Sequence, residues 1–230
     1  MDKHHTYLWL NFLTVFFPII LSFDKKVAYY KQWKYIFPSL FLTGILYLAW
    51  DYIFTKHQVW SFNPNYIVGI YFYGLPLEEI LFFITIPFAC IFIYLCLLAY
   101  IKTDYLANLA PYINNVLLLF SVLMLLMYID RLYSCINFGT LFLVLLYVHF
   151  NPNLMQMGRV YMAYMVTLLP FYIVNGLLTS IPVVMYNNAE NMGVRVGSIP
   201  LEDHFYSLSL FVINLIFYQH FKNKAEAQVP

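Results

Sequence analysis

Long apolar segments follow one another along the whole chain, with little polar sequence between them. A membrane-spanning helix needs roughly 20 apolar residues, and seven segments approach or reach that length. The segments are Tyr7–Phe23, Tyr35–Phe54, Leu75–Ile101, Pro111–Ile129, Leu132–Phe150, Val160–Ile181 and Ile199–Phe221. The pattern therefore predicts an all-α integral membrane protein with about seven transmembrane helices.

Composition agrees with this class. Hydrophobic residues make up 63% of the 230 residues and charged residues only 10%, far from the average of soluble domains. We therefore expect membrane lipid around the chain and no separate soluble domain. The net charge of +1 leaves no basic patch to neutralise phosphates, which excludes nucleic acid as a partner.

Positive charges are distributed unevenly between the two sides of a seven-span arrangement. One side carries Lys25, Lys26, Lys31, Lys34, Lys102, Arg159, Lys222 and Lys224, and the other carries Lys3, Lys56, Arg131 and Arg195. Since cytoplasmic loops are enriched in Lys and Arg, we expect the C-terminus in the cytoplasm. The first span lacks a small-residue cleavage site, so we expect it to be retained rather than removed as a signal peptide.

A motif occurs twice in the chain at an offset of 124 residues. The first copy runs from Phe62-Asn63-Pro64 through Gly69 to Pro76-Leu77-Glu78-Glu79, and the second from Tyr186-Asn187-Asn188 through Gly193 to Pro200-Leu201-Glu202-Asp203. The repetition indicates two copies of one unit. We expect a first three-helix repeat over residues 1–105, a linker helix over 106–130 and a second three-helix repeat over 131–230.

Four crossings separate equivalent helices in this arrangement, so both repeats would face the same way in the membrane. The two acidic pairs would then lie on one side, where a site between the repeats could bring them together. Each pair falls in a first helical turn, where free amides and the helix dipole favour carboxylates. A charged helix start at the membrane surface would show the same local pattern. Asp51, which aligns with Asn175, is a further acid in an apolar segment and a candidate of the same kind.

Asp51, Val59-Trp60-Ser61-Phe62-Asn63-Pro64 and Leu75-Pro76-Leu77-Glu78-Glu79 together resemble the signature of the membrane-integral lycopene cyclases. The resemblance implies the fused form of a heterodimeric enzyme, located in a bacterial or archaeal cell membrane, that closes the open ends of lycopene or a related carotenoid into ionone rings, most often β rings. It assigns importance to Glu78 and Glu79, and by weaker analogy to Glu202 and Asp203. It also suggests association with other carotenoid enzymes.

Ring closure of this kind adds one proton and removes another, so it needs no electron acceptor, and we expect no cofactor. A carboxyl group kept neutral in a dry pocket can hold the required proton. We expect Glu78 to be the principal acid, with Glu202 as its partner across the repeats. Glu79, Asp203 and Asp51 are candidates for orienting groups or bases. His57 and His204 could carry protons, although interfacial positions would explain them equally well.

A cationic intermediate is stabilised by aromatic ring faces. The candidate substrate-binding residues near the acidic motifs are Trp60, Phe62, Asn63, Tyr66, Tyr73 and Asn187. The two asparagines suit turns better than reactions, and aromatic residues are also common at membrane interfaces.

The sequence also bears on several other functions. A retinal protein would need a lysine within a span, and every lysine falls in a loop or tail. No His-x-x-x-His or comparable spacing indicates a metal site. A proton-coupled transporter with internal repeats, or a non-catalytic assembly subunit, would also suit paired acids in a repeated membrane protein.

Overall fold

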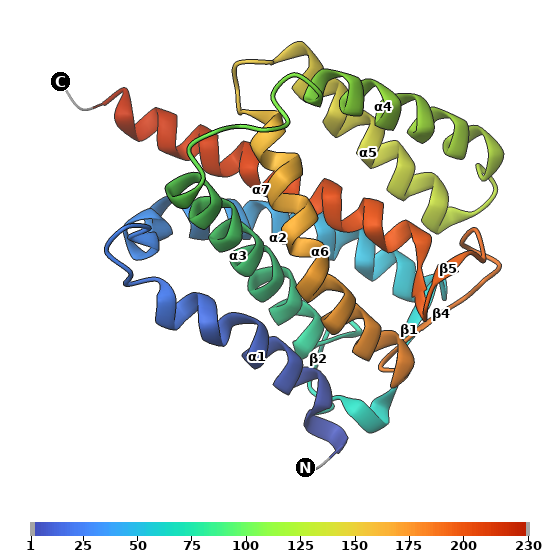
Figure 1. Ribbon diagram of the computed structural model, residues 1–230. Helices are drawn as coiled ribbons and strands as arrows, with labels where there is room; N and C mark the ends of the chain where they lie inside the picture. Colours follow the sequence, from blue (N-terminus) through green and yellow to red (C-terminus); the bar gives the residue numbers. More distant parts are fainter. Residues whose placement is uncertain (1–2, 229–230) are drawn as a thin grey trace.

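The computed structural model describes residues 3–228, which form seven α-helices and three pairs of very short strands (Figure 1). The α-helices are α1 (Thr6–Leu21), α2 (Trp33–Lys56), α3 (Leu77–Tyr100), α4 (Ala110–Met127), α5 (Leu132–Phe150), α6 (Met157–Ser180) and α7 (Leu201–Glu226). The strands are β1 (Trp60–Phe62), β2 (Tyr71–Phe72), β3 (Leu75–Pro76), β4 (Val184–Tyr186), β5 (Arg195–Val196) and β6 (Ile199–Pro200), and 3-10 helices lie at η1 (Lys3–His5), η2 (Tyr29–Gln32) and η3 (Pro64–Tyr66).

Each predicted span corresponds to one helix, and every helix begins within three residues of its predicted start. Six helices, α1 to α6, are long and apolar enough to cross a membrane, which fits an integral membrane protein. Their outward faces carry large apolar side chains such as Phe17, which is 65% exposed. Helix α7 falls outside this set because polar residues such as Asn214, Gln219 and His220 lie among its apolar ones and lower its hydropathy. It also continues past the predicted end into Lys222, Lys224 and Glu226.

The packing of the helices shows one pattern in both halves of the chain. Helix α1 packs on α3, and the corresponding α5 packs on α7. The middle helix of each half reaches across to the other half, α2 along α7 and α6 along α3. Helix α4 lies against α5 at one edge of the bundle, and α1 lies at the opposite edge (Figure 1).

The short strands gather at one end of the bundle, where the two halves are joined by pairing of β1 with β4 (Figure 1). Ser61 faces Met185 at the centre of this antiparallel pair, and these two positions are 124 residues apart. The flanking hydrogen bonds are reciprocal. The Asn63 amide donates to the Val183 carbonyl, and the Asn187 amide donates to the Val59 carbonyl, both at 2.9 Å. The two loops therefore meet with local two-fold symmetry.

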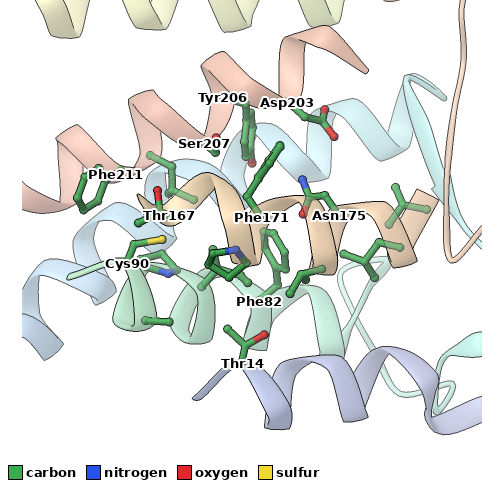
Figure 2. A pocket seen from close by; sticks show the side chains of 18 of the residues that line it. Thr14, Phe82, Cys90, Thr167, Phe171, Asn175, Asp203, Tyr206, Ser207 and Phe211 are labelled. Atoms are coloured by element: carbon green, nitrogen blue, oxygen red, sulfur yellow. The ribbon is translucent and has the colours of Figure 1, made fainter. Parts of the chain in front are cut away.

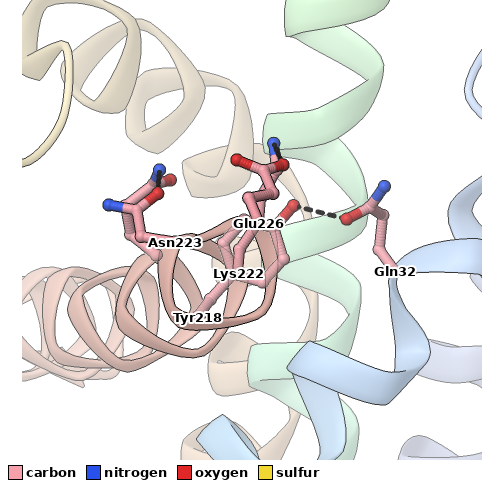
Figure 3. A network of polar contacts seen from close by, with 6 residues as sticks. Gln32, Tyr218, Lys222, Asn223 and Glu226 are labelled. Atoms are coloured by element: carbon pink, nitrogen blue, oxygen red, sulfur yellow. Dashed lines mark hydrogen bonds and ion pairs between the residues drawn. The ribbon is translucent and has the colours of Figure 1, made fainter. Parts of the chain in front are cut away.

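The other end of the bundle is held by different contacts. The Tyr218 hydroxyl of α7 donates to Gln32 at 2.9 Å, joining α7 to the start of α2 (Figure 3). The Arg159 guanidinium donates to the carbonyls of Ile101 and Lys102 at 2.7 and 2.5 Å and fixes the connection after α3. The loop before α4 comes so close to α6 that a Cβ on Gly158 would lie 2.3 Å from Asp104 Oδ1 and 2.7 Å from the Ala107 amide nitrogen.

This close approach predicts that Gly158→Ala destabilises the protein by about 1–3 kcal/mol, because backbone as well as side chain would have to move. Gly176→Ala in the same helix is the matched control, since nothing lies within 4 Å of its Cβ position. Alanine there should be neutral or stabilising by at most about 1 kcal/mol. Thermal unfolding of the detergent-solubilised protein measures both, and equal midpoints for the two variants would contradict the role of Gly158.

Candidate functional site

The first acid of each pair holds the loop that precedes its helix. Glu78 Oε1 accepts the Val68 amide at 2.7 Å, and Glu202 Oε1 accepts the Met192 amide at 2.5 Å. Both carboxyl groups are fully buried. Glu202 Oε1 also accepts the Ser134 hydroxyl at 2.7 Å. These two acids therefore act as anchors for the loop backbone.

The glycines of the repeated motif explain how the loops reach these anchors. Gly69 and Gly193 follow directly after the anchored amides and have φ angles of +86° and +73°. Residues that carry a side chain rarely adopt this left-handed backbone conformation, whereas glycine does so without steric cost. Pro76 and Pro200 then stand in extended conformation just before α3 and α7, so the acids fall in the first helical turn.

The first helix of each half fixes the start of the acidic helix. Asn11 in α1 donates to the Glu78 carbonyl at 3.0 Å, and Asn137 in α5 donates to the Glu202 carbonyl at 2.7 Å. The same faces of α1 and α5 carry Tyr7 and Tyr133 one turn earlier. Each half thus contains a Tyr-x-x-x-Asn pair directed at its own acidic motif.

The second acid of each pair lines an internal cavity and is bound by tyrosine hydroxyls. Tyr7 donates to Glu79 Oε2 at 2.6 Å. Tyr133 donates to Asp203 Oδ1 at 2.5 Å, and Tyr186 donates to Asp203 Oδ2 at 2.9 Å. Glu79 is 7% exposed and Asp203 3% exposed, so the residual exposure of both groups is toward the cavity.

The cavity runs from the two acids into the apolar interior of the bundle (Figure 2). Ile93 on α3 lies 14 residues beyond Glu79 in the sequence, a distance of about 21 Å along a helix. The walls come from α1, α3, α5, α6 and α7 and from the paired strands β1 and β4, and they are mainly apolar and aromatic. Figure 2 shows Phe82, Phe171 and Tyr206 between the acidic end of the cavity and its deeper, apolar part. The free volume of the cavity is about 90 Å³, so a long apolar molecule with one end at the carboxyls would need the walls to move apart.

Aromatic rings surround the acidic end of the cavity. The ring of Trp60 lies 5.3 Å from that of Tyr133 and 5.8 Å from that of Tyr186, centroid to centroid. Burial raises the pKa of Tyr186 well above its ordinary value, and the Asp203 charge raises it further. The phenol therefore remains a neutral hydrogen-bond donor. Ring faces at this position could stabilise a positive charge on a bound molecule.

The structure places the expected catalytic residues in two different surroundings. Glu79 and Asp203 line the cavity, while Glu78 and Glu202 face loop backbone and do not. Adjacent helical residues point about 100° apart, so one member of each pair faces the cavity and the other faces the loop. Asp51 is fully buried beside the cavity, where its Oδ1 accepts the Trp60 indole N–H at 2.7 Å.

Two of the expected binding residues, Trp60 and Phe62, line the cavity. The other four, Asn63, Tyr66, Tyr73 and Asn187, are not among its lining residues. The two asparagine side chains accept the amides of Asn65 and Ala189 at 3.1 and 3.0 Å and so form turns, and Tyr73 is 92% exposed. His57 and His204 also lie outside the lining, and the His204 ring contacts the Leu201 carbonyl and the Tyr172 hydroxyl.

Three residues that the sequence interpretation missed are the tyrosines that bind the cavity acids. Tyr7-x-x-x-Asn11 and Tyr133-x-x-x-Asn137 are 126 residues apart, whereas the acidic motifs are 124 apart. A gapless alignment therefore hides this correspondence, and a two-residue shift reveals it. Tyr186 belongs to the repeated motif itself, but its counterpart is Phe62, so the alignment gives no sign that its hydroxyl matters.

The geometry can be compared with known proteins. The family model described as "Lycopene cyclase" matches residues 4–97 and 130–221, most of both halves of the chain. The bifunctional lycopene cyclase/phytoene synthase of Aspergillus oryzae is 29% identical over 66 residues, which cover 29% of this chain and 11% of that protein. The protein of the same description in Neurospora crassa is 40% identical over 48 residues, covering 21% of this chain and 8% of that protein.

The matched segments thus span about a tenth of these two relatives. Both relatives are fungal, so they give no support to the bacterial or archaeal membrane that we expected. No solved structure matches the chain significantly. Because the family model covers both halves together with all four motif acids, the chain belongs to the lycopene cyclase family.

Proposed function

We propose that the chain cyclises open carotenoid ends by acid catalysis and that Glu79 and Asp203 carry out the proton transfers. The single observation that supports this most is the meeting of these two carboxyls, one from each half, at the end of a long apolar cavity. An elongated hydrocarbon could lie along the cavity and bring one end to both groups.

The proposed reaction is redox neutral. A carboxyl proton adds to the terminal alkene and forms a C–H bond, the resulting cation is attacked by a neighbouring double bond to form the ring C–C bond, and a ring C–H bond then breaks as its proton passes to a carboxylate. The molecular formula is unchanged, so the reaction belongs to the isomerases or intramolecular lyases. The rings of Trp60, Tyr133 and Tyr186 would stabilise the intermediate charge. We propose lycopene as substrate and β-ionone as ring type because the resemblance implies both.

We further propose that the two halves are parallel repeats, residues 1–105 and 131–230, with 106–130 as a linker. In support, the reciprocal hydrogen bonds of Asn63 and Asn187 and the equivalent anchoring of Glu78 and Glu202 relate the two halves. The family match is also interrupted between residues 97 and 130, where α4 lies. Parallel repeats place both acidic helix starts on one side of the membrane. Membrane lipid and other carotenoid enzymes are proposed neighbours of the outer surface.

The excess of Lys and Arg predicts that the end of the bundle opposite the strands faces the cytoplasm. Cysteine labelling in a bacterial inner membrane tests this, with the unsubstituted chain as background. A membrane-impermeant reagent should label Tyr73→Cys, at the strand end, in intact spheroplasts. It should label Asn153→Cys, in the loop between α5 and α6, only after permeabilisation. The opposite pattern would contradict the proposed orientation.

Expression in lycopene-accumulating bacteria tests the function. The chain should convert lycopene to one-ring or two-ring products of unchanged mass, whose absorption spectra report the ring type. Glu79→Gln should reduce conversion by at least about 100-fold, since a positioned general acid contributes 100-fold or more.

Glu78→Gln is the matched control. Its amide oxygen can still accept the Val68 amide, so we expect conversion within about tenfold of that of the unsubstituted chain. Equal amounts of each protein in the membrane must be shown. Full activity of Glu79→Gln would remove Glu79 from the role of acid, and unchanged lycopene with the unsubstituted chain would favour another carotenoid or a transport function.

A further inference from the structure

The two carboxyls in the cavity are not equivalent, although the motifs that carry them are. Given the proposed function, on which this inference rests, one carboxyl must give a proton and the other must take one. Tyr186 binds Asp203, and the position that corresponds to Tyr186 in the first half is Phe62, which also lines the cavity. Glu79 therefore lacks the second phenol that Asp203 has.

The hydrogen bonds differ accordingly. Both oxygens of Asp203 accept a phenol hydroxyl, at 2.5 and 2.9 Å. Glu79 accepts one, on Oε2 at 2.6 Å, and no hydrogen bond between described residues ends on its Oε1. Donors on both oxygens favour the charged carboxylate. A carboxylic acid accepts well on its carbonyl oxygen only and needs the other oxygen for its proton. Glu79 has this arrangement, because Oε2 accepts the Tyr7 hydroxyl and Oε1 is left for the proton.

The charged groups near Glu79 also differ from those near Asp203. Asp51 is buried near Glu79, close enough for the two carboxyls to interact electrostatically, so one of these two carboxyls keeps a proton. The position that corresponds to Asp51 in the second half is Asn175, which is neutral. The Arg195 guanidinium carbon lies 5.8 Å from the centre of the Tyr186 ring, close enough for its charge to act on Asp203. Its counterpart in the first half is Tyr71.

We infer that Glu79 is the acid that protonates the substrate and that Asp203, held as a carboxylate by Tyr133 and Tyr186, is the base that removes the ring proton. In one turnover the Glu79 O–H bond breaks and a substrate C–H bond forms. A ring C–H bond then breaks and an Asp203 O–H bond forms. Tyr186 is a positioning residue in this scheme, because it acts through Asp203. Return of one proton from Asp203 to Glu79 restores the starting state.

Two single variants, Tyr186→Phe and Phe62→Tyr, test the division of roles in lycopene-accumulating bacteria. Tyr186→Phe weakens the base after the cation has formed, so the cation should more often lose a different proton or add water. The fraction of ring products with a displaced double bond or one added water should rise about tenfold, the effect of one hydrogen bond to a charged group. Lycopene consumption should change much less.

Phe62→Tyr brings a second phenol near Glu79 and favours its carboxylate form. Consumption of lycopene should therefore fall about tenfold, while the products that do form keep the distribution of the unsubstituted chain. Tyr172→Phe is the matched control, because the Tyr172 hydroxyl contacts the His204 ring and Tyr172 does not line the cavity. It should behave like the unsubstituted chain.

The opposite pattern, with aberrant rings from Phe62→Tyr and only slower consumption from Tyr186→Phe, would reverse the two roles. Identical effects of both variants, or none from either, would overturn the division of roles while leaving the cyclase proposal intact. Inactivity of the unsubstituted chain toward every carotenoid would overturn both proposals. Protein amounts in the membrane and the behaviour of Tyr172→Phe separate these results from misfolding.

Discussion

The structure depends on burying four carboxyl groups at the starts of two helices inside an apolar bundle. An unpaired buried carboxyl is costly, and each of the four is given at least one hydrogen-bond donor. Some donors are the loop amides of Val68 and Met192, 10 residues before the acids that accept them. The others are the tyrosines of α1 and α5, which lie 72 and 70 residues from their acids. Satisfying these acids therefore also fixes the loops, the first helix of each half and the mouth of the cavity.

Under the proposed function, the duplicated unit explains how one chain obtains two different reactive groups. Both halves use the first acid as an anchor and the second as a cavity group, and both place a Tyr-x-x-x-Asn pair on the neighbouring helix. Differences at a few equivalent positions, such as Phe62 and Tyr186, then change the environment of the second acid in one half only. A redox-neutral cyclisation needs both a donor and an acceptor of protons, and divergence of two equal halves is a short route to such a pair.

Much of the fold follows from the sequence because apolar segments of membrane length leave few alternatives. The helix starts at Leu77 and Leu201 are fixed by the prolines before them. The tight connection around Asp130 follows from the short gap between one apolar segment and the next. The pairing of β1 with β4 could not be read from three-residue segments, since it depends on two loops meeting across the halves. The crossing of α2 and α6 between halves is likewise a property of tertiary packing.

The candidate site was predicted at the level of the motif but not of the residue. The repeated Pro-Leu-acid-acid sequence located the acids, and the two members of each pair differ in direction because adjacent helical residues point about 100° apart. Which member of each pair faces the cavity depends on the loop that precedes the helix, because Glu78 and Glu202 each bind the backbone of their own loop. The left-handed conformations of Gly69 and Gly193 set the path of these loops. The tyrosine partners escaped notice because their offset differs by two residues from that of the motif.

An experimental structure of the Glu79→Gln variant with lycopene bound would test the catalytic cavity most directly. We expect one end of the carotenoid between the side chains at positions 79 and 203, with the polyene running along α3 toward Ile93. A carotenoid bound with both ends remote from Glu79 and Asp203, for instance on the outer apolar surface, would contradict the assignment of this cavity as the site of cyclisation.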